Sequence, residues 1–404
     1  MVNQKKINEF ISCIHQNGSD KIEVLFNALE SCNYSELKCL YSKVPRIYKG
    51  LFSLSFLKRT SFSQINKTSK FIYLNTSEII GKQVYVILMH SKIINKYLSY
   101  KNKYEFLYLN GLYDEARIIL NKIDHEISYS YWAMSNYIRM ERMQKGVNAA
   151  IKVHNEYWHA NDNLIIKKFC NAAFYTSALD YSSDIKKKLY YKPENEYAKK
   201  LNNLVSTRYF AFEGINEENE LCIDFCTSII DLYNHFIICI SNVTQEHITE
   251  DIRLGLKEVA EAVEDPYILK LCILYDIKTT KNYNNPIERN SIIKDYVNQN
   301  YNNVIENVPN YLKSKNVFDA ELLIMLSKSM VNHGSDTSIL KNDGTIYESI
   351  KYHLCQLLNR KDDVTFHQRK LEDLCKSQFD ITEIRYLYFT IKAICNTDIY
   401  NEVI

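Results

Sequence analysis

The sequence is poor in the two residues that build tight turns. Its 404 residues include 9 glycines and 5 prolines. Hairpin turns and strand-rich sandwiches require these residues at fixed positions. An all-α chain needs the fewest, so the shortage favours an all-α fold. No two glycines have the spacing of a phosphate-binding loop, which argues against enzymes that hold a nucleotide on such a loop.

Long hydrophobic runs and paired cysteines are also missing. No stretch of 18 apolar residues occurs, so no membrane-spanning helix is expected, and the first twenty residues lack the apolar stretch of a secretion signal. The eleven cysteines include no Cys-x-x-Cys pair. Most lie inside apolar runs, as Cys272 does between Leu271 and Ile273, which is typical of reduced core residues. We therefore expect a cytoplasmic protein with no membrane partner.

Motifs for catalysis and metal binding are absent too. The chain has no Gly-x-Ser-x-Gly elbow and no recognisable cysteine and histidine pair. His154 and His159 are five residues apart, which places their rings on different helix faces, whereas zinc ligation from one helix needs them one turn apart. Cys222 and Cys226 have no two further ligands nearby. We expect no catalytic residue, no metal and no cofactor, and hence no enzyme.

What the sequence does contain is helical periodicity. Between residues 112 and 127, apolar side chains recur at i, i+4, i+7, i+8, i+11 and i+15, which is one face of a helix. Tyr104, Leu107 and Tyr108 form a shorter helical pattern. It ends at Gly111, and glycine can adopt the left-handed conformation that closes a helix. The segment is therefore predicted to be a helix, a tight turn and a second helix.

A spacing of 34 residues relates this helical hairpin to a second one. Ala116 maps to Ala150, so that each second helix has a small residue at the same place. With Gly111, Tyr113 and Ala116 at the pattern positions, the segment 101–160 resembles tetratricopeptide repeats. The resemblance implies an α-α superhelix, a solenoid of stacked antiparallel helical hairpins whose concave face binds a protein or peptide.

The second unit departs in part from this pattern. It keeps Gly146 and Ala150 but has Val147 where an aromatic residue is expected. Tyrosine suits such grooves because it offers a large contact area at low rotamer cost. The groove candidates lie on the first helices of the two units and are Tyr104, Tyr108, Tyr131, Ser135, Asn136 and Arg139.

Further helices are expected along the rest of the chain. Asp265 precedes Pro266, which predicts a helix start with a capping residue and a proline at the first helical position. Only residues 72–90, in which Val84 to Ile87 are β-prone, suggest a strand, and a buried helix fits them equally well. The other expected helices are 161–178, 222–241, 251–264, 266–278, 347–359, 381–395 and a stripe formed by Phe318, Leu322, Leu323, Met325, Leu326 and Met330.

Charge is balanced overall but uneven along the chain. The net charge is +2, whereas the segment from Lys38 to Lys96 has eleven bases and the single acid Glu78. Cations interleaved with aromatic residues are typical of sequence-tolerant single-strand binding. A basic rim around a buried aromatic core, or a surface that docks an acidic protein, explains the pattern as well. The polyanion-binding candidates are Lys49, Lys58, Arg59, Lys67 and Lys70.

These patterns predict three regions. They are an N-terminal helical region, 1–100, with the basic segment 38–96, a region of tetratricopeptide-like repeats, 101–280, and C-terminal helical repeats, 281–404. The favoured function is a non-enzymatic scaffold that binds a protein or peptide partner. The alternative is an adaptor or regulator that binds nucleic acid through the basic segment, including an accessory subunit of a bacterial or phage defence system by analogy of fold. These sequence patterns identify neither the partner nor the oligomeric state.

Overall fold

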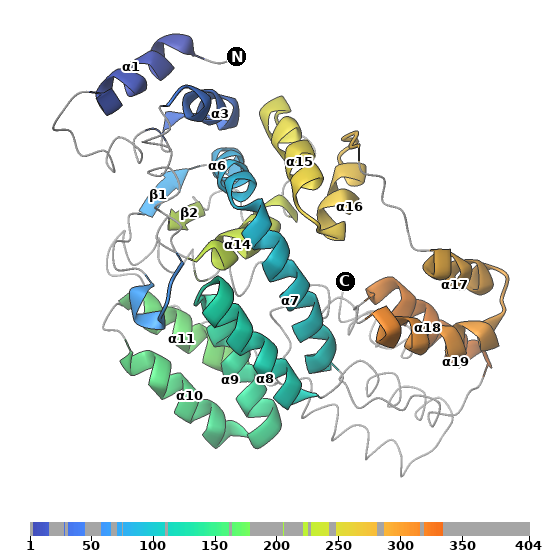
Figure 1. Cartoon of the computed structure of the whole chain (residues 1–404). Helices are drawn as coiled ribbons and strands as arrows, with labels where there is room; N and C mark the ends of the chain where they lie inside the picture. The colour runs from blue at the N-terminus through green and yellow to red at the C-terminus, as the bar shows by residue number, and fades with distance from the viewer. Residues whose placement is uncertain are drawn as a thin grey trace, which may run out of the picture.

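A computed structural model describes residues 3–15, 28, 31–44, 58–65, 71–74, 76–109, 112–160, 164–177, 205, 221–224, 228–241, 248–280, 287–315 and 319–333. Regular structure in these ranges is helical apart from one pair of four-residue strands (Figure 1). The prediction of an all-α fold is therefore confirmed. The helices expected at 347–359 and 381–395 lie outside the described residues, as does Phe318.

Three helices near the N-terminus pack in sequence order. They are α1 (Gln4–His15), α3 (Tyr34–Lys43) and α6 (Thr76–Met89). A capping box begins α3: the Asn33 side chain accepts the Glu36 N–H at 2.9 Å, and the Glu36 carboxylate accepts the Asn33 N–H at 3.2 Å. Because α3 packs on both α1 and α6, it joins the first helix to the core.

The next helices form two consecutive hairpins and a closing helix. They are α7 (Ser91–Leu109), α8 (Tyr113–Lys122) with a π-helical turn η2 (Ile123–Ile127), α9 (Tyr131–Lys145), α10 (Val147–His159) and α11 (Leu164–Thr176). Helix α7 packs on α8, α9 packs on α10, and α11 packs on both α9 and α10. Ala116 and Ala150 are both fully buried, as their spacing predicted. Gly146 joins α9 to α10 at a φ of 84°, where a side chain would be strained.

The chain then returns to its N-terminal helices. Helices α14 (Ile229–Ser241), α15 (Glu250–Ala262) and α16 (Pro266–Leu274) follow in sequence, and α14 packs on α6, α7 and α9 while α15 packs on α3 and α6. Where α15 meets α6, a Cβ atom at Gly255 would lie 2.8 Å from Cγ1 of Val84, so the crossing needs glycine. The predicted cap is confirmed, because the Asp265 carboxylate accepts the Tyr267 N–H at 2.9 Å.

One expected helix start changes, and the choice between a strand and a buried helix is decided. Strands β1 (Phe71–Leu74) and β2 (Leu221–Asp224) form an antiparallel pair in which Phe71 is opposite Asp224. The helix expected at 222–241 therefore begins only at 229, and Cys222 lies in a strand. The β-prone run from Val84 to Ile87 is helical and buried, because α6 is surrounded by α3, α14 and α15.

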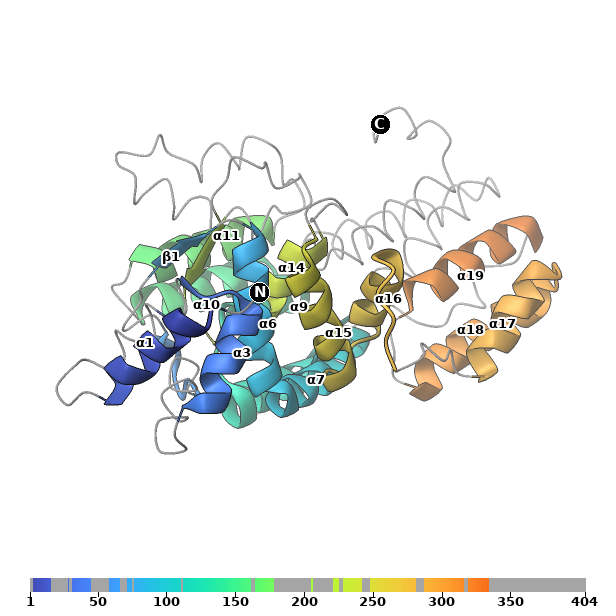
Figure 2. The same ribbon diagram turned by 90° about the horizontal axis from the view of Figure 1, so that it is seen from above.

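Helices α17 (Ile287–Val297), α18 (Tyr301–Lys315) and α19 (Ala320–His333) form a three-helix unit. The buried Arg289 guanidinium contacts both carboxylate oxygens of Asp319, at 2.6 and 3.2 Å. One of these oxygens also accepts the Leu322 N–H at the start of α19. Figures 1 and 2 show this unit at one side of the molecule. The stripe predicted for α19 has Leu322, Leu323, Leu326 and Met330 buried.

The predicted division of the chain needs one correction. The boundary between residues 100 and 101 falls inside α7. A single apolar core includes side chains from α3, α6, α7, α8, α14 and α15. The first two predicted regions therefore share one core, and the hairpins do not continue as a linear array through α14 to α16.

Candidate interaction surface

The six side chains predicted to line a partner groove lie in the core, which corrects that prediction. None of them is more than 3% exposed. The reason is that the first helices of the two hairpins, α7 and α9, pack on α14, and α9 also packs on α11. The buried residues are Tyr104, Tyr108, Tyr131, Ser135, Asn136 and Arg139.

Several of these polar groups bond to one another. The Tyr104 hydroxyl donates to the Asn136 side-chain oxygen at 3.1 Å, and the Asn136 amide donates to the Trp132 carbonyl at 2.8 Å. The Ser135 hydroxyl donates to the Tyr131 carbonyl at 2.8 Å. Hydrogen bonds of this kind allow polar side chains to be buried at low cost. These polar groups therefore belong to the buried interior of the hairpins.

Helix α14 reaches the N-terminus of α9 through Asp231. The two carboxylate oxygens of Asp231 accept the N–H groups of Tyr131, at 2.8 Å, and Trp132, at 3.0 Å. The Ser130 hydroxyl oxygen accepts the Ala133 N–H at 3.0 Å. Three N–H groups that the helix leaves unsatisfied thus have partners, and the negative charge complements the helix dipole. The chain's own α14 therefore occupies the inner side of the hairpins.

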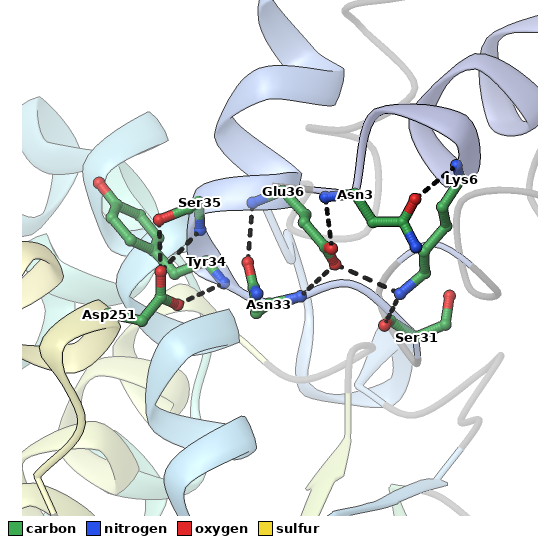
Figure 3. Close-up of polar contacts among 8 residues, drawn as sticks. All are labelled: Asn3, Lys6, Ser31, Asn33, Tyr34, Ser35, Glu36 and Asp251. Carbon is green, nitrogen blue, oxygen red and sulfur yellow. Dashed lines mark hydrogen bonds and ion pairs between the residues drawn. The ribbon is translucent and has the colours of Figure 1, made fainter. Parts of the chain in front are cut away.

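A second carboxylate closes the N-terminus of α3 in the same way (Figure 3). Asp251 of α15 accepts the N–H groups of Tyr34, at 2.9 Å, and Ser35, at 3.2 Å. Beside it, Glu36 accepts the backbone N–H of Asn3 and the Lys6 ammonium. Burial by itself would raise the pKa of Glu36, but these hydrogen bonds outweigh it and hold that pKa below its ordinary value.

Two of the five predicted polyanion-binding residues can be placed. Lys49, Lys67 and Lys70 lie outside the described residues. The Lys58 ammonium donates to the carbonyl of His125 in the π-helical turn. The backbone of Arg59 pairs with the segment that follows this turn, because its carbonyl accepts a backbone N–H there at 3.1 Å. Both residues therefore hold the segment 58–65 against the turn.

Other bases of the segment 38–96 pair with acids that come later in the chain. Lys38 contacts Glu258 on α15, and Lys96 contacts Glu126 at 2.8 Å. Burial alone would raise the pKa of Glu258, but hydrogen bonds from Lys38 and Tyr34 lower it. Part of the local positive charge therefore serves contacts within the molecule.

A histidine and a cysteine also meet in the core, where sequence spacing did not reveal them. His235 Nδ1 lies 2.6 Å from the Gln83 amide nitrogen and 3.6 Å from the Cys239 sulfur. Burial raises the pKa of Cys239, and it raises the pKa of Cys170 to about 12. A buried, protonated thiol is a poor nucleophile. We therefore interpret these contacts as core packing. One of them joins His235 to Gln83, which lies 152 residues earlier in the chain.

The π-helical turn contains a buried carboxyl group. Asp124 is 5% exposed, and its Oδ1 accepts no hydrogen bond from the described residues. Burial raises the pKa of Asp124 to about 7. A hydrogen bond with the Tyr137 hydroxyl lowers this pKa, but its effect is smaller than that of burial. Turns of this type occur often at functional sites. No sequence pattern pointed to Asp124, because an acid in an amphipathic helix is normally placed at the surface.

The outer side of the hairpins has apolar and aromatic side chains, interspersed with His154, Lys167 and Asn171, that the sequence analysis missed. Along α10 and α11, side chains at helical spacing are exposed or half-buried, and two of them, Trp158 and Phe174, also pack against the apolar core. The spacing on α10, i, i+4, i+7 and i+11, could have identified them. We define the α10–α11 face as Val147, Ile151, His154, Trp158, Leu164, Lys167, Asn171, Phe174 and Tyr175.

Contacts across the two helices fix this face. His154 Nε2 lies 3.0 Å from the Asn171 side-chain oxygen, and the rings of His154 and Phe174 are 5.1 Å apart between centroids. The Lys167 ammonium lies 5.5 Å from the centroid of Trp158. The Arg142 guanidinium lies 4.6 Å from the centroid of Phe174. Cations over aromatic rings stabilise such surfaces.

Comparison with protein-family models, with curated proteins and with solved structures finds no match for this chain. In the ranges that the structure describes, no three His, Cys, Asp or Glu side chains are grouped to hold a metal ion. The described helices include none that is both long and apolar enough to cross a membrane.

Proposed function

We propose that the protein is a non-enzymatic scaffold or adaptor that binds a protein partner on its helical hairpins. The hairpins α7–α8 and α9–α10 are proposed to be divergent tetratricopeptide-like units. In support, α8 begins at Tyr113 and α10 at Val147, 34 residues later, with buried alanines at matching positions. The binding side differs from the one expected, because the inner side is filled by α14.

One observation carries the proposal most strongly. Val147, Ile151, Leu164 and Tyr175 are between 40% and 56% exposed and belong to the α10–α11 face. Single exposed apolar residues are normal on a protein surface, but a set gathered at helical spacing on two packed helices is typical of interaction sites.

The buried cysteines support the non-enzymatic and cytoplasmic parts of the proposal. Cys32, Cys170, Cys239 and Cys272 are free and buried. Burial raises the pKa of each of these thiols, to about 11 in Cys272. Protonated core thiols fit a reducing compartment and offer no activated nucleophile.

The test is affinity purification of the tagged full chain from its native host, with each preparation divided into nuclease-treated and untreated halves. Mass spectrometry and nucleic-acid staining are the readouts. We expect a protein in stoichiometric amount that survives nuclease treatment. Nucleic acid that co-purifies and is lost at high salt, without such a protein, would overturn the scaffold proposal in favour of the alternative function.

A further inference from the structure

We propose that the π-helical turn η2 is a proton-sensitive latch for the segment 58–65. The segment stays closed over the turn while the Asp124 carboxyl is protonated, and it opens when that carboxyl is ionised. This inference concerns the chain alone, so it does not rest on the proposed scaffold function. Opening would expose an apolar part of the hairpins and release the Lys58 ammonium from its partner in the turn.

The segment 58–65 is attached to the turn and the residues that follow it by three hydrogen bonds between described residues. The Lys58 ammonium donates to the carbonyl of His125. The Arg59 N–H donates to the Ser128 hydroxyl at 3.1 Å, and the Arg59 carbonyl accepts the Tyr129 N–H at 3.1 Å. A short element held by few contacts opens at a lower free energy than helices packed in a core. The segment is therefore the part of this site that moves most easily.

Two apolar side chains complete the attachment. Phe62 and Ile65 are buried, and they belong to an apolar cluster with side chains of α9 and α11. Figure 1 shows the single helical turn of the segment, η1 (Phe62–Gln64), beside α11. The ring of Phe62 lies 4.6 Å from the ring of Tyr157 on α10, between centroids. The segment therefore covers apolar side chains of the second hairpin.

Three tyrosines lie near the Asp124 carboxyl. Burial raises the pKa of Tyr129, Tyr137 and Tyr157, and negative charge on Asp124 raises the pKa of each further. Tyr137 is held within the hairpins, because its hydroxyl donates to the side-chain oxygen of Asn121 at 2.6 Å. The positions of the other two tyrosines depend on the segment.

The segment contacts both of these tyrosines. Tyr129 bonds to the backbone of Arg59, and Tyr157 packs on the ring of Phe62. If the segment moves away from the turn, both contacts are lost and water can reach Asp124. The carboxyl oxygen Oδ1 accepts no hydrogen bond from the described residues, so it gains most from this access to water.

No cation of the described residues stabilises an ionised Asp124 in the closed arrangement. Burial raises the pKa of Asp124, and the one opposing effect is the hydrogen bond with the Tyr137 hydroxyl. The neighbouring acid, Glu126, is exposed and pairs with Lys96. An ionised Asp124 must therefore be stabilised by water. The basic side chains around the turn, none of which affects the pKa of Asp124, are Lys58 and Arg59 in the segment, Lys96 in α7, Arg117 and Lys122 in α8, and His125 in the turn itself.

The direction of the pH effect follows from these contacts. In the closed state burial raises the pKa of Asp124 to about 7, whereas a carboxyl in contact with water titrates at about 4. Between these values the closed state binds more protons than the open state, so rising pH favours opening. From pH 5 to pH 7 the opening equilibrium constant should rise about fiftyfold, with little further change above pH 8.

Hydrogen exchange of the full-length protein, followed by mass spectrometry at pH 5, 6, 7 and 8, measures this equilibrium once the rates are corrected for the intrinsic pH dependence of exchange. The reporters are peptides covering 58–65, in which the N–H groups of Gln64 and Ile65 bond to the carbonyls of Ser61 and Phe62. We expect their protection to fall about fiftyfold from pH 5 to pH 7.

A low concentration of urea separates opening of the segment from unfolding of the whole chain. Unfolding exposes far more surface than a local opening does, so it responds more steeply to urea. In about 1 M urea, exchange in the segment should be unchanged, whereas exchange in the core helix α15 should accelerate.

Asp124→Asn removes the titrating group, and Glu115→Gln, at an exposed position on α8, is the matched control. The protection of the segment should be the same at pH 5 and pH 7 in Asp124→Asn, and the control should retain the fall of the wild type. Tyr137→Phe keeps the ring but loses the hydroxyl that lowers the pKa of Asp124. In this second variant the fall should move to higher pH, which tests the latch even if Asp124→Asn does not fold.

Three results would overturn the latch. They are protection of the segment that does not change with pH in the wild type, a fall that Asp124→Asn retains, and a urea dependence in the segment equal to that of α15. Protection that rises with pH would also refute it, since an ionised Asp124 would then attract Lys58 and close the segment.

Discussion

The N-termini of α9 and α3 are closed by the same device in two different environments. In each, a side chain next to the helix accepts the third N–H, and an aspartate from a distant helix accepts the first two. Asp231 is 3% exposed and its bonds to α9 are buried, whereas the bonds from Asp251 to α3 are only partly buried. Loss of the aspartate carboxylate should therefore cost more stability at the N-terminus of α9 than at the N-terminus of α3.

The difference shows how the fold is held together. A buried N–H that loses its partner cannot bond to water, so removing its acceptor costs the desolvation of that group. A half-buried N–H recovers much of this energy from solvent. Asp231 therefore fixes α14 inside the hairpins, and Asp251 aligns the first helices on a core that already exists.

Asp231→Ala should destabilise the protein strongly. It leaves two buried N–H groups of α9 without their acceptor, which costs about 4 kcal/mol in comparable cases. Urea denaturation followed by circular dichroism measures the free energy of unfolding. Asp231→Asn is the matched variant, since it keeps one acceptor oxygen, and it should lose about half as much. Equal, small losses in both variants would show that α14 is held by apolar packing alone.

Asp124 extends the comparison to a buried carboxyl whose Oδ1 accepts no hydrogen bond from the described residues. Burial raises the pKa of Asp124 to about 7, compared with about 4 in an unfolded chain. Between these two pH values the folded state binds more protons at Asp124 than the unfolded state does. The contribution of Asp124 to the free energy of unfolding therefore falls as pH rises from about 4 to about 7, and it is constant above pH 7.

Asp124→Asn should remove that loss. Between pH 5 and pH 8, the variant is expected to gain about 2.6 kcal/mol relative to the wild type, since this range covers close to two pH units of the window and each is worth at most about 1.4 kcal/mol. Urea denaturation at the two pH values measures the difference. Parallel pH dependence in both proteins would show that Asp124 is ionised in the folded state across this range.

The sequence predicted local structure well because local structure depends on neighbours in the chain. The apolar period from Ala116 to Ile127, the alanines 34 residues apart and the cap at Asp265 all follow from spacing along one helix. Such spacings predict where a helix lies along the chain and which of its sides faces the core. They placed α11, α15, α16 and α19 within about four residues of the bounds that the structure gives.

The predictions that failed concerned which distant segment of the chain packs on a given helix. Tyr104 and Arg139 were assigned to a groove because they lie on the first helices of the two units, but α14, which packs on α7 and α9, comes about a hundred residues later. No periodicity records which distant segment covers a face. Asp231 and Asp251 look like ordinary acids in the first turns of their own helices, so their roles at α9 and α3 could not be predicted.

Asp251→Ala tests the weaker end of the comparison. We expect a loss of about 1 kcal/mol, typical of an exposed helix cap, because Asn33 still accepts the third N–H of α3 and water can reach the first two. Hydrogen exchange should show faster exchange in α1 and α3 and unchanged exchange in α9, whereas Asp231→Ala should affect α9 first. A loss as large as that of Asp231→Ala would contradict the role of burial, since each carboxylate accepts the first two N–H groups of its helix and Asp251 accepts the Ser35 hydroxyl as well.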